Sequence, residues 1–68
     1  MRIRRESFYR CTFSSPASLR VAHVRAWDAD EAAQLFQVEL RTDGVDERGE
    51  IQVTLLGGGP EEAHAAYP

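Results

Sequence analysis

The fold is decided by residues 27–41, WDADEAAQLFQVELR, the only segment whose apolar residues recur at the spacing of a helix of several turns. Asp28 is a preferred N-cap residue, and Glu31, three positions later, can reach back to the Asp28 amide to complete a capping box. Gly44 can adopt the left-handed conformation that ends a helix. The sequence therefore predicts one helix, from Asp28 or Ala29 to about Thr42.

One stripe of this helix is apolar and needs a sheet to cover. At roughly 100° per residue, the stripe contains Ala29, Ala32, Ala33, Phe36 and Leu40. Leu35 lies at its margin, and Val38 lies almost opposite. Val38 is interpreted as a scattered surface valine, with a contact patch formed together with Leu35 as the alternative.

Alternating residues predict strands on both sides of the helix. Residues 3–13 alternate with Tyr9, Cys11 and Phe13 on the better core face, and Pro16 lies in the turn that follows. Residues 19–26 would turn Ala22, Val24 and Ala26 toward the helix. The clearest strand contains Ile51, Val53 and Leu55.

These elements predict an α+β fold of one small domain: a three-stranded antiparallel ββαβ sheet, order 2-1-3, with one helix on one face and the other face open. The compact domain is expected over residues 1–57. Residues 58–68 are expected to form a flexible C-terminal tail with too little apolar surface to pack, so that deleting residues 59–68 should leave the melting temperature unchanged.

Composition narrows the class of protein. A chain of 68 residues has room for one small core, and Cys11, its one cysteine, cannot form an internal disulfide and is expected to be a buried, inert thiol. No apolar run approaches the ~18 to 20 residues of a membrane span, and the first residues do not resemble a signal peptide. The chain is expected to be cytoplasmic, and whether it forms a homodimer stays open.

Charge is segregated along the chain. Residues 1–27 hold six arginines and one glutamate, whereas residues 28–68 hold two arginines and ten acidic residues. The sequence thus predicts a basic strand layer behind an acidic helix and loop.

No pattern of residues predicts catalysis, a metal or a cofactor. Cys11, His23 and His64 come from three separate segments, which is unlike a zinc site. Cys11 and His23 are expected on different faces, so they do not form a nucleophile and base. The run Gly57-Gly58-Gly59 precedes Pro60 and not the helix of a phosphate loop. Asp43, Asp46 and Glu50 lack the register of a calcium loop.

Two surfaces are candidates for partner contact. The first is acidic, on the helix and the loop after it, where carboxylates could stand in for phosphates; the alternative interpretation is a solvated face. It contains Asp30, Glu31, Glu39, Asp43, Asp46 and Glu47. The second is the open face of the sheet, where arginines accompany an aromatic ring. It contains Arg4, Phe8, Arg10, His23 and Arg25.

Residues 24–36, VRAWDADEAAQLF, form a strand end followed by a capped, alanine-rich helix, with a final strand after it. This layout resembles that of small phage-encoded inhibitors, including some anti-CRISPR proteins. The resemblance is one of architecture over about three quarters of the chain, and it transfers no motif residue. It implies a stand-alone protein without a catalytic site that blocks a nucleic-acid-binding or recruitment surface of a host complex.

The sequence therefore predicts a non-enzymatic protein-binding module. The expected role is that of a phage or mobile-element inhibitor that occupies a binding surface of a bacterial nucleic-acid-handling complex, for example a CRISPR ribonucleoprotein. The alternative is a small domain that binds RNA or single-stranded DNA through the open sheet face, with Arg10 and Arg25 on phosphates and Phe8 stacked on a base.

Overall fold

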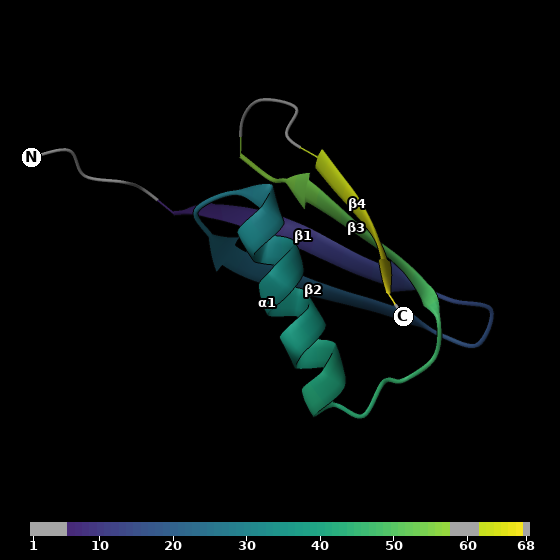
Figure 1. The fold of residues 1–68 in the computed structure, drawn as a ribbon. Coiled ribbons are helices and arrows are strands. Elements are labelled where there is room, and N and C mark those ends of the chain that lie inside the picture. Colours follow the sequence, from purple (N-terminus) through teal and green to yellow (C-terminus); the bar gives the residue numbers. More distant parts are fainter. Residues whose placement is uncertain (1–5, 58–61, 68) are drawn as a thin grey trace, which may run out of the picture.

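The computed structural model describes residues 6–57 and 62–67. In this part of the chain an antiparallel sheet is covered on one face by a helix (Figure 1). The elements in chain order are β1 (Ser7–Ser14), β2 (Leu19–Ala26), α1 (Ala29–Thr42), β3 (Gly49–Leu55) and β4 (Glu62–Tyr67). The α+β class, the helix and the first three strands agree with the sequence-based prediction.

The sheet has four strands in the order β2-β1-β3-β4, and every neighbouring pair is antiparallel. The predicted order 2-1-3 is therefore correct for the first three strands. The prediction of only three strands is wrong, because residues 62–67 of the expected tail form β4 beside β3. The rest of that tail, residues 58–61 and 68, lies outside the described residues.

Tyr67 explains why β4 joins the sheet. Its side chain is buried, its ring packs edge-on against Phe13 with centroids 5.3 Å apart, and its hydroxyl donates to the Val45 carbonyl at 2.8 Å. Ala63 and Ala65 alternate with it and pack against the core. One large aromatic side chain thus supplies the apolar surface that the sequence analysis judged to be missing.

Both ends of α1 are capped as the sequence predicts. The Glu31 amide donates to Asp28 Oδ1 at 2.8 Å, and Gly44 has a φ of +80°. The Val45 amide then donates to the Leu40 carbonyl and the Gly44 amide to that of Arg41, which is the Schellman arrangement. One detail differs: Glu31 Oε1 accepts from the amide of Trp27, one residue before the expected Asp28.

The core lies between α1 and the sheet. The predicted stripe of α1 is buried as a whole, and it meets Tyr9, Cys11 and Phe13 of β1. Close approach is needed at Gly49, where a Cβ atom would collide with the Phe13 ring and the Ser14 carbonyl. Val45, in the loop after α1, is also buried.

The helix α1 is the one helix among the described residues. It has neither the length nor the apolar character needed to cross a membrane.

Candidate interaction surface

The face of the sheet opposite α1 is uncovered in the described part of the chain. The register of the strands places side chains in rows across it, because directly paired residues point to the same face. The predicted open-face residues lie together there, apart from Arg4, which is outside the described residues. They are Phe8, Arg10, His23 and Arg25, and the register places Thr12, Val21, Gln52 and Thr54 on the same face.

The β1–β2 half of this face combines arginine with apolar side chains. Arg25 is paired with Phe8, and its guanidinium carbon lies 4.9 Å from the centre of the Phe8 ring, a cation–π contact. Arg10 is paired with His23 in the next row. Phe8 is 54% exposed and Val21 56% exposed. Exposed aromatic and arginine side chains of this kind are typical of protein interfaces.

The β3–β4 half is different in charge. Glu50 is paired with Ser14, Glu62 with Thr54 and His64 with Gln52, so all three side chains lie on the open face. Of the two strands in this half, β3 was predicted and β4 was not, because residues 62–67 were expected to belong to a tail. The alternation of Ala63, Ala65 and Tyr67 with Glu62, His64 and Ala66 was the signal that could have revealed β4.

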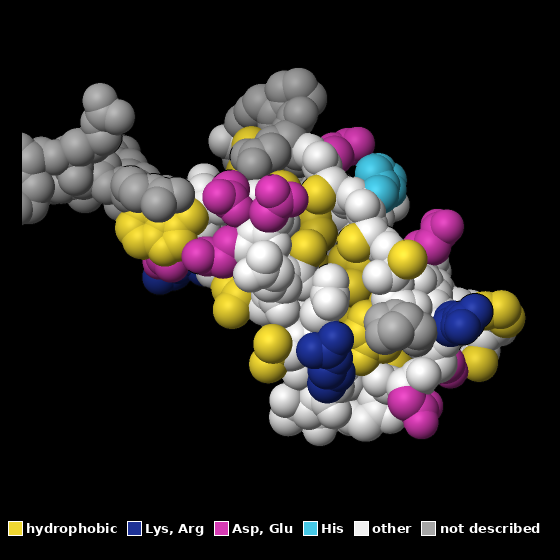
Figure 2. Space-filling model, viewed as in Figure 1, with side chains coloured by type: hydrophobic (Ala, Val, Ile, Leu, Met, Phe, Trp, Pro, Cys, Tyr) yellow, Lys and Arg dark blue, Asp and Glu magenta, His cyan; other side chains and the backbone are white. Residues whose placement is uncertain are grey.

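The acidic set is distributed over both ends of α1. Asp30 and Glu31 lie in its first turn, whereas Asp43 caps its last turn and Asp46 and Glu47 follow in the loop. A helix of 14 residues is about 21 Å long, so the two groups are far apart. Figure 2 shows acidic side chains in separate groups on this side of the molecule.

Three of the six acids hold parts of the fold together. Glu31 accepts from the Trp27 amide at 3.0 Å, and Glu47 accepts from the Ser18 hydroxyl at 2.7 Å. Asp43 pairs with Arg20 at 3.2 Å. The other three, Asp30, Glu39 and Asp46, are exposed.

Apolar side chains are also exposed on the helix. Leu35 is 46% exposed and Val38 58% exposed, and they lie three residues apart on one side of α1. This agrees with the surface position predicted for Val38. Two isolated aliphatic residues are a smaller apolar surface than the open sheet face provides.

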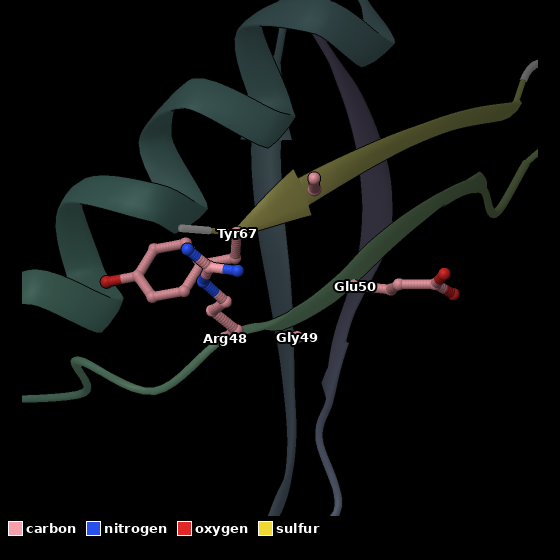
Figure 3. A pocket seen from close by; sticks show the side chains of 5 residues that line it. Arg48, Gly49, Glu50 and Tyr67 are labelled. Atoms are coloured by element: carbon pink, nitrogen blue, oxygen red, sulfur yellow. The ribbon is translucent and has the colours of Figure 1, made fainter.

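A hollow of about 510 Å³ lies where β3 begins and β4 ends. Arg48, Gly49, Glu50, Ala66 and Tyr67 line it. Figure 3 shows Arg48 beside the Tyr67 ring and Glu50 pointing away from both. The Tyr67 hydroxyl is already bonded to the Val45 carbonyl. The hollow therefore offers a general surface for contact, with no convergent set of reactive groups.

Cys11 is fully buried, as predicted. Its Sγ lies 3.8 Å from the Ala32 carbonyl. Burial, with a smaller contribution from the negative charge of Glu39, raises the pKa of the thiol from 9.0 to about 11. The thiol is therefore protonated at neutral pH, which makes it a poor nucleophile.

No group of three or more histidine, cysteine, aspartate or glutamate side chains suited to a metal ion occurs within residues 6–57 and 62–67. Comparison of the chain with protein-family models, curated proteins and solved structures finds no match.

Proposed function

We propose that this protein is a non-enzymatic protein-binding module that contacts its partner through the open face of its sheet. The observation that carries the proposal is the gathering of exposed apolar and arginine side chains on the β1–β2 half of that face. They are Phe8, Arg10, Leu19, Val21 and Arg25.

A protein partner fits this surface better than a nucleic acid does. Leu19 and Val21 offer aliphatic surface but no ring on which a base could stack. The Phe8 ring already carries the Arg25 guanidinium. Glu50 and Glu62, on the other half of the face, would repel a phosphate backbone that continued across the sheet.

The open face is also a better candidate for the contact surface than the acidic set is. Three of the six acidic residues are already bonded to other parts of the fold. Asp30 and Glu31 lie at the opposite end of α1 from Asp43, Asp46 and Glu47. The acidic set is the second candidate surface, on which carboxylates would take the place of phosphates. The exposed carboxylates of Asp30, Glu39 and Asp46 support it.

The proposed role is inhibition of a bacterial nucleic-acid-handling complex by covering one of its recruitment surfaces. A small domain with an exposed contact face and no convergent reactive groups in its described part suits such a blocking role. The architectural resemblance to phage-encoded inhibitors is the reason to choose a bacterial complex, including a CRISPR ribonucleoprotein, as the first target to test.

The test is affinity capture from a bacterial lysate at physiological salt, with three forms of the full chain as bait. The first is the unchanged protein. The second is Arg10→Glu with Arg25→Glu, on the open face, and the third is Asp30→Arg with Glu39→Arg, on the helix. We expect the first and third baits to retain the same partner and the second to lose it, because reversed charges disrupt a complementary interface.

Each other result has a distinct meaning. Loss of the partner only with the helix variant would favour the acidic surface. Retention by all three baits would contradict both surfaces. If the material retained is nucleic acid and nuclease treatment removes it, the nucleic-acid-binding alternative gains and the protein-binding proposal fails.

A further inference from the structure

Strand β2 ends the sheet on one side, and its outer edge has a defined set of backbone groups. The Leu56 amide donates to the Phe8 carbonyl at 3.0 Å across the β1–β3 pair. The amide and carbonyl of one residue point to the same side of a strand, and consecutive residues alternate. Phe8 and Arg10 therefore bond toward β3, whereas Tyr9 and Cys11 bond toward β2.

The same alternation fixes the free edge of β2. Tyr9 pairs with Val24 and Cys11 with Ala22, so Val24 and Ala22 direct their backbone groups to β1. The intervening residues must direct theirs away from the sheet. The free edge thus presents the amides and carbonyls of Leu19, Val21, His23 and Arg25.

This edge has few of the features that prevent strand-to-strand association. Proteins protect edge strands with proline, lysine, bulges or short length. The strand β2 has 8 residues, its pairing with β1 is uninterrupted, and it contains neither proline nor lysine. Of its two arginines, Arg20 is paired with Asp43 and Arg25 lies over the Phe8 ring. Leu19 is 67% exposed and Val21 56% exposed beside the free groups. The opposite edge, β4, has 6 residues, three of which are alanine.

We propose that two copies of this chain associate through β2, antiparallel and around a two-fold axis, to form one continuous sheet. The axis is perpendicular to the sheet, so both helices lie on one face and both open faces on the other. This inference goes beyond the proposed function, because it concerns the protein without its partner and would double the open face offered to that partner.

The side chains of β2 determine where the axis passes. Residues with outward-directed backbone groups must pair with residues of the same kind in the second copy. The two registers that satisfy this condition with the greatest overlap are centred on Ala22 or on His23. A centre at His23 places two imidazoles directly opposite each other. A centre at Ala22 instead pairs His23 with Val21 of the second copy.

The Ala22-centred register is complementary along its whole length. It pairs Leu19 with Arg25 of the second copy, so the arginine stem can cover the exposed leucine. On the helix side it pairs Arg20 with Val24 of the second copy, and Arg20 is already neutralised by Asp43. Like charges are not directly opposite in any of these pairs, and small alanine side chains meet at the axis.

The first test measures association of the unmodified protein by sedimentation velocity from micromolar to millimolar concentration. We expect a monomer–dimer equilibrium. Val21→Lys, which places a charge beside the free edge, should raise the dissociation constant about tenfold or more, equivalent to ~1.4 kcal/mol. Val38→Lys is the matched control, since Val38 is 58% exposed on α1 against 56% for Val21. It should leave the constant unchanged, and circular dichroism should show both variants folded.

The second test measures the register. In the proposed dimer the two Ala22 Cα atoms are directly opposite and about 4.5 Å apart, which a disulfide can span. The two His23 Cα atoms are offset along the strands by about 7 Å and therefore lie about 9 Å apart, which a disulfide cannot span. Oxidation of Ala22→Cys should therefore give a covalent dimer, whereas His23→Cys should give none. Cys11, buried in the core, is present in both variants and does not distinguish them.

The outcomes separate clearly. A monomer at every concentration together with no covalent Ala22→Cys dimer overturns the proposal. Crosslinking of His23→Cys in place of Ala22→Cys overturns the register, and dissociation by Val38→Lys but not Val21→Lys places the interface on the helix instead. None of these results depends on partner capture, so failure here leaves the proposed function untouched.

Discussion

Neighbouring residues of α1 show how strongly position on the helix decides the contribution of a side chain. Phe36 is 1% exposed, whereas Leu35 is 46% exposed. We expect Phe36→Ala to lower the free energy of unfolding by about 3 kcal/mol or more, because it removes a large side chain from a packed core. Leu35→Ala should cost less than about 1 kcal/mol. Chemical denaturation measures both, and equal effects would mean that the helix presents a different face to the sheet.

Cys11 makes stability depend on pH in the alkaline range. Burial raises the pKa of the thiol from 9.0 to about 11, so between these values the folded chain holds a proton that the unfolded chain releases. The contribution of the Cys11 thiol to the free energy of unfolding is fully present below pH 9 and is lost as the pH rises toward 11. We expect the free energy of unfolding to fall more steeply with pH in this range for the unchanged protein than for Cys11→Ala. Parallel curves for the two proteins would contradict the assignment.

The sequence predicted which residues of α1 are buried, but it did not predict every buried residue of the protein. Five positions of α1 follow from helical period, since the period is a local property. The burial of Val45 depends on the Schellman turn that carries it under the helix, and the sequence shows only a polar loop there. Charge segregation along the chain likewise did not reveal that Glu31, Asp43 and Glu47 each bond to another segment of the fold.

Among the elements, the end of α1 depends on a single glycine. Gly44 has a φ of +80°, where a Cβ atom is disfavoured whatever the space around it. We expect Gly44→Ala to cost about 1 kcal/mol of folding stability. Gly57→Ala is the control, because a Cβ atom there would have no neighbour within 4 Å. It should change stability by less than about 0.5 kcal/mol. Similar losses in the two variants, measured by denaturation, would argue against the cap.

The strand β4 gives the clearest contrast with the sequence-based prediction. We expect a chain ending at residue 61 to lose roughly 10 °C or more in melting temperature, since losing a buried aromatic costs about 3 kcal/mol and each kcal/mol moves a small domain by ~4–8 °C. Tyr67→Phe should lose about 1 to 2 kcal/mol, because it leaves the buried Val45 carbonyl without its donor. His64→Ala, at an exposed position of β4, serves as the control. An unchanged melting temperature of the shortened chain would restore the interpretation as a tail.

β4 has only a weak signal in the sequence, the alternation of its side chains. Its alanines have low strand propensity, and its apolar face is narrow except at Tyr67. The residues that hold it are Ile51 and Val53 of β3, which pair with Ala65 and Ala63. The pairing with β3 and the burial of Tyr67 thus hold β4 in place, and the pattern of residues 62–67 by itself shows neither. The strand β2, by contrast, was predicted with its bounds because a turn and a capped helix enclose it.

Considered as a whole, the molecule carries a charge of −3, yet its open face is basic on one half and acidic on the other. The sequence predicted the basic half and the openness of the face, because both follow from alternation within β1 and β2. The acidic half was not predicted, because Glu62 belongs to β4, which was expected to be part of a tail. This division of charge, more than the net charge, decides what the face can bind.

The divided face limits how strongly the domain can bind a single-stranded nucleic acid. Arg10 and Arg25 are the two arginines that the described strands place on the open face. Each phosphate contact on a single strand contributes about −0.7 to the slope of log K against log salt, so two contacts give a slope of about −1.4. We expect labelled single strands to bind weakly at low salt with that shallow slope, and not to bind at physiological salt. Arg10→Glu with Arg25→Glu should abolish the low-salt binding, whereas Asp30→Arg with Glu39→Arg should leave the slope unchanged.

A slope of about −3 or steeper would require more cations than these strands supply. The arginines at positions 2, 4 and 5 would then have to take part, and the nucleic-acid-binding alternative would displace the protein-binding proposal.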